Sequence, residues 1–149
     1  MARSPIQVLV IPYRMPLTGS CEFGVFHRPE PDMWQFVSGG AEDDETPEQA
    51  AKREAFEEAQ IPLSLPLLQL DSFATVPRKA FPDASHWPKS LYVVPEYAFA
   101  VDVSAYPITL SQEHDEIRWL NFKEAYGRLT WDSNRTAMWE LNERLCTER

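Results

Sequence analysis

Three glutamates in one short segment could hold a metal ion. Glu54, Glu57 and Glu58 stand at positions i, i+3 and i+4. On an α-helix these spacings place the carboxylates on one face, with neighbouring Cβ atoms about 5–6 Å apart, where like charges repel one another. A hard divalent cation such as Mg²⁺ relieves this repulsion, because it takes oxygen ligands and bridges carboxylates to phosphates. The alternative is a solvated acidic helix face without a chemical role.

The helix that carries these glutamates has recognisable ends. Thr46 is the expected N-cap, Pro47 suits the first helical position, and Gln49 completes a capping box of the Thr-x-x-Gln type. Pro62 disfavours helical geometry at the residue before it, so the helix should end near Gln60. The small and apolar residues between these ends should pack on a sheet.

The other predicted elements form a frame around this helix. Apolar and β-branched runs predict strands at residues 6–13, 22–27, 34–37, 67–76, 91–103 and 116–120. The second strand is expected to pair with the first as a hairpin, and a short helix is expected at residues 123–129. Strands and helices that do not strictly alternate predict an α+β domain, an α/β/α sandwich in which helices cover both faces of a mixed sheet.

Two loops and a final helix complete the frame. Residues 28–32 and 77–90 are expected to be loops, and a loop as long as the second is usually functional or disordered. The final helix should begin at a cap formed by Asp132 or Ser133 and reach about Cys146. Its expected apolar contacts include Trp139, Leu141 and Leu145.

Length and composition predict one soluble domain spanning residues 1–149. Hydrophobic residues make up 44% and charged residues 25% of the chain, which is typical of globular proteins. No apolar run approaches the roughly 20 residues that cross a bilayer, and no small-residue cleavage site marks a signal peptide. Cys21 and Cys146 show no metal-site spacing. We therefore expect a cytoplasmic protein without membrane contact.

The net charge restricts the class of partner. A formal charge of −9 argues against binding to long nucleic acid, which depends on basic surface. A small polyanionic substrate is compatible with this charge, because bound metal ions and a few local basic side chains can reverse the field inside a cleft. We expect a small-molecule partner.

The glutamates belong to a longer spaced pattern. Gly39 is followed by five residues, Glu45, seven residues and then Arg-Glu-Ala-Phe-Glu-Glu-Ala-Gln-Ile at residues 53–61. This pattern resembles the Nudix box, Gly-x5-Glu-x7-Arg-Glu-U-x-Glu-Glu-x-Gly-U, in which U is apolar, and the strand order also resembles a Nudix domain. Gln60 stands where the pattern has its second glycine, which normally supplies a left-handed C-cap. The resemblance implies that Arg53 and Glu45 form an ion pair that steadies the loop before the helix.

The resemblance also implies a metal centre on the acidic helix face. Mg²⁺, with Mn²⁺ as an alternative, would be held by the carboxylates of Glu54, Glu57 and Glu58. The backbone carbonyl of Gly39 or Gly40 would be a further ligand. The ion would neutralise phosphate oxygens, lower the pKa of a bound water and align it for in-line attack.

Nudix enzymes often recruit another carboxylate from a later loop, and three candidates are Glu113, Asp115 and Glu116. A Glu-His pair at residues 113–114 resembles the branch that acts on dATP or dihydroneopterin triphosphate. We expect Glu113 to be the metal ligand or general base. An exposed acidic turn is the alternative interpretation.

Substrate contacts are expected from three further places. Asn134, in the segment Trp-Asp-Ser-Asn-Arg that also resembles this branch, could pair with a base edge through its amide. Arg28 is a candidate phosphate contact, although a surface arginine is equally compatible with its position. Arg78 and Lys79 open the long loop and are candidate phosphate contacts as well. We expect Trp34, Phe36 and Tyr97 to be core residues rather than a stacking platform for a base.

The resemblance therefore implies a Mg²⁺-dependent hydrolase of a pyrophosphate bond. The expected substrate is a nucleoside triphosphate of the dATP type or dihydroneopterin triphosphate, with a monophosphate and pyrophosphate as products. The alternatives are a dinucleoside polyphosphate, a nucleotide sugar, an RNA 5′ end, or a non-catalytic module that senses a ligand. All three helical glutamates are present, which disfavours the module. Nudix domains often form homodimers, but no exposed apolar stripe predicts an interface.

Overall fold

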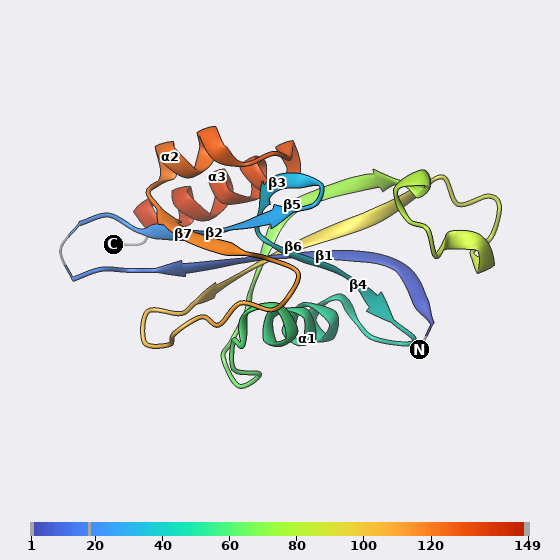
Figure 1. Ribbon diagram of the computed structural model, residues 1–149, viewed down its shortest axis with the longest axis horizontal. Coiled ribbons are helices and arrows are strands. Elements are labelled where there is room, and N and C mark those ends of the chain that lie inside the picture. The colour runs from blue at the N-terminus through green and yellow to red at the C-terminus, as the bar shows by residue number, and fades with distance from the viewer. Residues whose placement is uncertain (1, 18, 148–149) are drawn as a thin grey trace.

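Strand β1 (Arg3–Arg14) lies inside a seven-stranded mixed sheet (Figure 1). This computed structural model describes residues 2–17 and 19–147. Strand β6 (Val93–Asp102) runs parallel to β1 along one side, and β5 (Leu68–Pro77) pairs with the far side of β6 in antiparallel orientation. Along its other side β1 pairs with β4 (Val37–Glu42), also antiparallel. The strand that bears both glycines of the site is thus anchored to the middle of the sheet.

The rest of the sheet is built around β2 (Glu22–Pro29). Its first residues pair with the end of β1, as the predicted hairpin requires. β3 (Asp32–Gln35) and β7 (Glu116–Leu120) pair with β2 in antiparallel orientation. Because β7 follows the acidic turn directly, this pairing brings the turn to the sheet.

Helices cover both faces of the sheet, as predicted for an α+β fold. Helix α1 (Pro47–Ala59) lies on one face, and α2 (Phe122–Arg128) and α3 (Asp132–Thr147) lie on the other (Figure 1). In the part of the chain that the structure describes, no helix is both long and apolar enough to span a bilayer.

The alternation of side chains along β1 creates two core layers. Val8 and Val10 pack with the alanines of α1, whereas Leu9 and Ile11 pack with Met138 and its neighbours on the α3 side. Successive residues of a strand face opposite sides of its sheet, and a strand covered on both faces is apolar throughout. The apolar run at the start of the chain therefore fixes which helices lie on which face.

The predicted strand at residues 34–37 proved to be parts of two strands. β3 ends at Gln35 and pairs with β2, whereas β4 begins at Val37 and pairs with β1. The backbone N–H of Phe36, between them, donates to Oδ1 of Asn134 (3.0 Å). The chain changes partner strands at this residue because a side chain from α3 takes its N–H.

Two further expectations are corrected. The loop at residues 28–32 is shorter than predicted, because Pro29 and Asp32 pair as the last residues of the β2–β3 hairpin. Trp139 does not face the core, since 54% of it is exposed, and the preceding residue Met138 is fully buried instead. The predicted phase of α3 was wrong by one residue at this position. The other predicted strands and helices are present.

Helix α1 has the predicted capping box and an unusual end. Thr46 Oγ1 accepts from the N–H of Gln49 (3.2 Å), and the Gln49 side chain accepts from the N–H of Thr46 (2.9 Å). At the other end Gln60 adopts the left-handed conformation, with φ 57° and ψ 32°. The following N–H, of Ile61, donates to the carbonyl of Ala55 (3.3 Å). The helix therefore ends as it would with glycine, and Gln60 carries the steric cost.

Replacing Gln60 by glycine should stabilise the protein. A side chain in the left-handed region costs about 1–2 kcal/mol, which glycine avoids. We expect Gln60→Gly to raise the free energy of unfolding by about 1 kcal/mol in urea titrations. Lys52→Gly, in the middle of α1, is the control and should lower it by about 1 kcal/mol. A Gln60→Gly protein no more stable than the wild type would show that the left-handed cap costs nothing here.

A glutamate of α3 closes an irregularity in β5. The pairing of β5 with β6 shifts register between Gln69 and Phe73. Within this shift the backbone N–H groups of Asp71 and Ser72 donate to the carboxylate of Glu140 at 2.8 and 2.7 Å, and the Ser72 hydroxyl donates at 2.6 Å. Burial alone would raise the pKa of Glu140, but these hydrogen bonds outweigh it and hold the pKa below its usual value.

Charge on Glu140 should therefore stabilise the fold in a pH-dependent way. Because its folded-state pKa is depressed, its contribution is complete above the unfolded pKa of about 4.5 and is lost as the pH falls through the folded pKa. We expect Glu140→Gln to lower the free energy of unfolding by about 1–3 kcal/mol near neutral pH. The deficit should shrink as the pH is lowered from about 6 to about 3. An equal deficit at about pH 6 and at about pH 3 would contradict this account of Glu140.

Candidate active site

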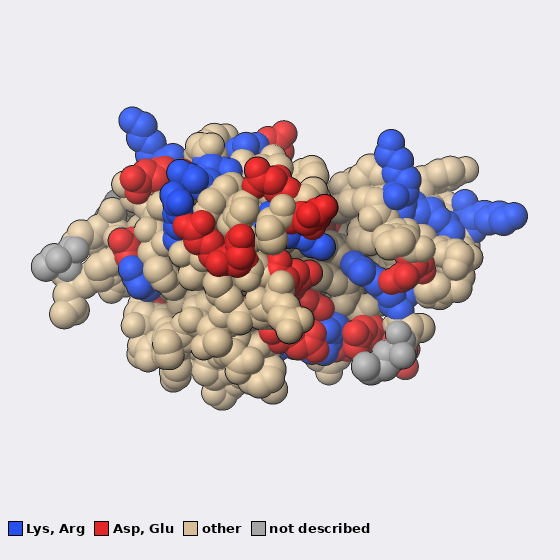
Figure 2. Space-filling view, viewed as in Figure 1, with Lys and Arg blue, Asp and Glu red and all other residues tan. Residues whose placement is uncertain are grey.

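Acidic side chains gather across the middle of the face shown in Figure 2, from the β2–β3 hairpin down to α1. Lys and Arg side chains project at the right-hand end of the same view, where the loop that follows β5 lies. An anionic substrate could approach the acidic side chains only with compensating positive charge.

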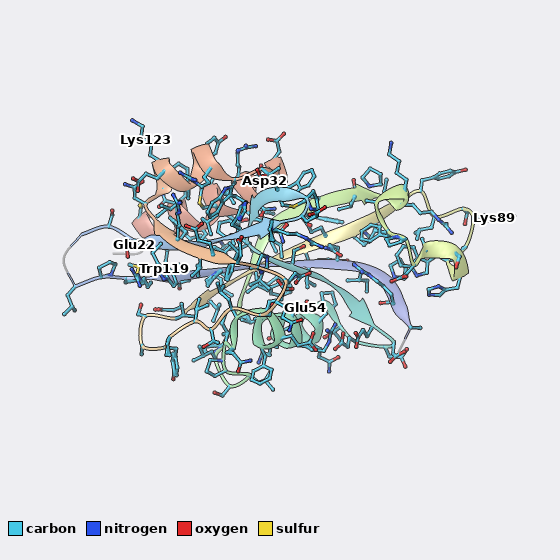
Figure 3. The ribbon with its side chains drawn as sticks, viewed as in Figure 1. Glu22, Asp32, Glu54, Lys89, Trp119 and Lys123 are labelled. Carbon is cyan, nitrogen blue, oxygen red and sulfur yellow. The ribbon has the colours of Figure 1, made fainter. Side chains whose placement is uncertain are left out.

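Strand β4 brings a glycine against the first glutamate of the helix face. Glu54 projects from α1 toward β4 (Figure 3). A Cβ atom on Gly39 would lie 2.2 Å from Cδ of Glu54, closer than any real Cβ contact. Any larger residue at position 39 would therefore displace the Glu54 carboxylate. The box glycine is needed here for close approach rather than for backbone conformation.

Arg53 organises the carboxylates around it. Its guanidinium donates to both carboxylate oxygens of Glu45, at 2.8 and 3.0 Å, and to the carbonyl of Gly40 at 2.8 Å. It also donates to Glu54 at 2.9 Å and to Glu57 at 3.2 Å. The hydrogen bonds from Arg53 lower the pKa of Glu45. The structure thus brings Arg53 and Glu45 together as a bidentate pair, the geometry that fixes direction best.

Glu58 lies at the centre of the site in an unfavourable environment. It is 3% exposed, and neither carboxylate oxygen has a hydrogen-bond partner among the described residues. Burial, together with the neighbouring carboxyls of Glu54 and Glu113, raises the pKa of Glu58 well above its usual range. Among the described residues, the one basic side chain that pairs with Glu58 is His114, at 3.9 Å, and the pKa of this histidine is lowered by burial.

The acidic turn before β7 reaches the same place. Ligand atoms of Glu58, Glu113 and His114 lie within 4.8 Å of one another. His114 is buried, and burial lowers its pKa and keeps the ring neutral. Its Nε2 faces the amide nitrogen of Gln35 at 3.2 Å, so Nε2 accepts and Nδ1 carries the proton, 3.9 Å from Glu58. His114 therefore presents a donor toward Glu58.

The other late carboxylates are committed elsewhere. Asp115 pairs with Nδ1 of His27 at 2.7 Å, and Glu116 pairs with Arg118 at 2.5 Å. Glu113 alone of the three joins the group around Glu58. This placement supports the choice of Glu113 over its neighbours.

These groups suit a hard divalent cation. Glu54, Glu58 and Glu113 offer carboxylate oxygens, which Mg²⁺ prefers, and the orphaned oxygens of Glu58 need a positive partner. Glu57 is more peripheral, because its side chain is 53% exposed and contacts Arg53. The carbonyl of Gly40 already accepts from Arg53, which favours the neighbouring Gly39 as the backbone ligand.

A cavity of about 450 Å³ lies near this group; the carboxylates do not line it, but Ser38, whose backbone approaches Glu58, does. Of the expected substrate contacts, Arg28 and Asn134 line it, and Arg28 lies 3.6 Å from Glu113. Asn134 is buried, and its Oδ1 accepts from the N–H of Phe36, which takes one of the two lone pairs of this oxygen. The structure therefore places both residues at the cavity and gives the Asn134 oxygen a part in holding β3 and β4.

Arg78 and Lys79 lie apart from this group. The Arg78 guanidinium donates to the carbonyls of Ala84, Trp87, Pro88 and Leu91, and so holds the loop that follows β5 in shape. Lys79 lines a separate hollow on that loop. The same loop lines the 450 Å³ cavity with apolar residues instead, Ala80 and Phe81 among them.

Three residues that were not among the expected site residues line the cavity as well: Gln35, Ser38 and Glu96. Glu96 has the clearest signal, since it is the one charged residue in the otherwise apolar run of β6 before its last residue. Of the expected core aromatics, Phe36 is fully buried, whereas Trp34 and Tyr97 are partly buried. Neither Trp34 nor Tyr97 lines the cavity.

Comparisons with known proteins point to one family. The family model described as the NUDIX domain matches residues 20–140. A solved structure of a NUDIX hydrolase from Listeria monocytogenes, described without a substrate, is 46% identical, with 96% of this chain and 95% of that chain covered and a TM-score of 0.86. The Escherichia coli dihydroneopterin triphosphate pyrophosphohydrolase is 26% identical, with coverage of 96% and 98% and a TM-score of 0.76.

A curated relative agrees with these structures. The dihydroneopterin triphosphate diphosphatase of Haemophilus influenzae is 29% identical over 111 residues, which cover 73% of this chain and 70% of the relative.

A methyl group on Gly39 should weaken metal binding. Because it would displace the Glu54 carboxylate, we expect Gly39→Ala to reduce Mg²⁺ affinity about 10- to 100-fold, as loss of ligand support does in other metal sites. The measurement is the rise in melting temperature across an Mg²⁺ titration. Gly127→Ala is the matched control, because a Cβ there meets nothing within 4 Å. Equal Mg²⁺ affinity of the Gly39→Ala and Gly127→Ala proteins would remove Glu54 from the ligand set.

Proposed function

Because the chain belongs to the NUDIX domain family of hydrolases, which act on phosphorus-containing anhydrides, we propose that it cleaves a pyrophosphate bond in a nucleoside or pterin triphosphate with Mg²⁺. The observation that carries this proposal is the position of Glu58. Its buried carboxylate lies beside those of Glu54 and Glu113. Ser38, which neighbours Glu58, and Arg28, which neighbours Glu113, line a cavity large enough for a small ligand. Glu54, Glu58 and Glu113 could there hold a cation near the phosphate chain of a ligand in the cavity.

The residues divide the work between them. Glu54, Glu58 and Glu113 would hold Mg²⁺ together with the Gly39 carbonyl, and Glu57 would lie at the rim. When bound, the ion neutralises phosphate oxygens and lowers the pKa of a coordinated water.

Residues around the ligands orient the substrate. Arg28, 3.6 Å from Glu113, is placed to contact the phosphate chain as it enters the cavity. Glu113 is 38% exposed and is placed to accept a proton from the attacking water. Arg53 keeps Glu54 and Glu57 oriented, and Glu45 fixes Arg53. Positioning of this kind supplies most of the catalysis in phosphoryl transfer.

The triphosphate is favoured by two relatives. The Escherichia coli and Haemophilus influenzae enzymes are both named for dihydroneopterin triphosphate. We propose the same bond cleavage here, with a monophosphate and pyrophosphate as products. The site takes residues from β1, β4, α1, β6, the turn before β7 and α3, so we propose that the chain acts as a single domain.

Removing one carboxylate charge should abolish turnover without unfolding the protein. We expect Glu58→Gln and Glu113→Gln to lower kcat about 100-fold or more on the preferred triphosphate. The free energy of unfolding of Glu58→Gln should not fall, because no described residue donates a geometrically good hydrogen bond to this buried carboxyl. Glu116→Gln, which removes the partner of Arg118, is the control and should keep wild-type kcat.

The measurement is release of pyrophosphate and of phosphate, with Mg²⁺, across nucleoside triphosphates, dihydroneopterin triphosphate, dinucleoside polyphosphates, nucleotide sugars and capped RNA. Pyrophosphate release from a triphosphate supports the proposal. Turnover confined to the other substrates would overturn the substrate class, and full activity of Glu58→Gln would overturn the metal site.

A further inference from the structure

We propose that Glu96 selects the ring of the substrate, by accepting two hydrogen bonds from the neighbouring N–H groups of a 2-amino-4-oxo ring such as a pterin or a guanine. This inference rests on the proposed function, because it assigns the ring that accompanies the triphosphate. The role is that of a specificity-determining residue, distinct from the carboxylates that act on the phosphates.

Glu96 occupies a buried position on the wall of the cavity. It is 7% exposed, and in β6 it pairs with Gln7 of β1 on one side and Ala74 of β5 on the other. Glu96 lines the 450 Å³ cavity together with Ser133 of α3. It also borders a second cavity, of about 340 Å³, between β5 and α3. The sheet therefore presents a carboxyl group to the interior of the pocket.

The distance from the phosphate end suits a ring at this position. Ser38 of β4, Gln7 of β1 and Glu96 of β6 lie on three neighbouring strands, and Gln7 donates to the Ser38 hydroxyl at 2.9 Å. Ser38 pairs with Leu9 and Glu96 pairs with Gln7, so two strand spacings and an offset of two residues separate the Cα atoms of Ser38 and Glu96 by about 12 Å. Ser38 lies near Glu58, since its backbone approaches that carboxylate. A substrate whose phosphates lie near Glu58 would thus place its ring at Glu96.

Among the buried polar side chains that line the cavity, Glu96 can accept the most further hydrogen bonds. The other two that are buried there are Gln35, whose amide nitrogen faces His114, and Asn134, whose oxygen and nitrogen contact Phe36 and Ser133. The Ser133 hydroxyl lies close enough to Glu96 to oppose the rise in the pKa of this carboxyl. A carboxylate can accept about four hydrogen bonds, so a ligand can still contribute donors.

The remaining walls suit a flat ring. Met33, Phe81 and Trp131 line the cavity and offer apolar or aromatic surface against which a ring can lie. Apolar walls with a few convergent polar groups are the usual composition of a small-molecule pocket. The walls bind many rings alike, so discrimination falls to the polar groups at the cavity wall.

The chemistry of Glu96 favours a ring edge with two donors. Burial raises the pKa of Glu96, and the Ser133 hydroxyl opposes that shift. Two adjacent N–H groups match the two oxygens of an ionised carboxylate and offset its desolvation. A 2-amino-4-oxo ring presents such a pair at its ring N–H and amino group. Adenine presents an acceptor beside its amino group and leaves one carboxylate oxygen facing a lone pair.

The test compares the wild type with Glu96→Gln on substrates of both ring classes. An amide keeps the shape but offers one acceptor and one donor, which fits adenine and mismatches the two-donor edge. We expect Glu96→Gln to lower kcat/KM for dGTP and dihydroneopterin triphosphate at least about tenfold, mainly through KM, and to maintain or raise it for dATP. Asp132→Asn is the control, because this carboxylate lines the same cavity but is 98% exposed, and it should leave the ratio unchanged.

A second readout separates this inference from the proposed function. Binding of neopterin, guanosine and adenosine, which carry no phosphate, is measured by the shift in melting temperature. Neopterin and guanosine should stabilise the wild type more than adenosine does, and Glu96→Gln should lose this difference. An unchanged ratio and unchanged ligand shifts in Glu96→Gln, with triphosphate turnover intact, would overturn the role of Glu96 alone. Absence of triphosphate turnover in the wild type, with the ligand shifts as expected, would overturn the proposed function alone.

Discussion

A buried carboxylate without a partner is the constraint on which the site depends. Glu58 is enclosed by α1, the acidic turn and the sheet, and the described protein groups leave both of its oxygens unsatisfied. Burying an unpaired polar group costs about 1–3 kcal/mol, and more for a charged one. The capping box and the left-handed Gln60 fix the ends of α1, and the Arg53–Glu45 pair joins the helix to the loop before it. A cation bound at Glu58 would therefore offset the free-energy cost of burying this carboxyl.

The same sheet separates the chemistry from the recognition of the substrate. Residues of β4, α1 and the turn before β7 form the carboxylate end, while β6 and α3 form the far wall of the cavity. Asn134 couples the two ends, because its oxygen fixes Phe36 at the point where β3 gives way to β4. The acidic side chains on the face shown in Figure 2 favour a substrate whose negative charge is neutralised by a bound cation.

Local signals in the sequence predicted the parts of this site that depend on local chemistry. The ends of α1 follow from Thr46, Gln49 and the proline after the helix, and the ligand face follows from helical spacing. Residues 34–37 could not be divided correctly, because the cause is a contact with Asn134, far along the chain. Arg78 was expected at the phosphates, but loop carbonyls that only the folded structure brings together take its donors. Glu96 needed the register of β6 to show which way it faces.

Calorimetric titration of Mg²⁺ in buffers of different ionisation enthalpy tests the central claim most directly. Because burial and the neighbouring carboxyls raise the pKa of Glu58, Mg²⁺ binding near neutral pH should displace a proton from this group. The wild type is expected to release protons on binding Mg²⁺, and Glu58→Gln is expected to bind more weakly and to lose that release. Mg²⁺ binding without proton release, and with the same affinity in Glu58→Gln, would contradict the assignment of Glu58 as the buried metal ligand.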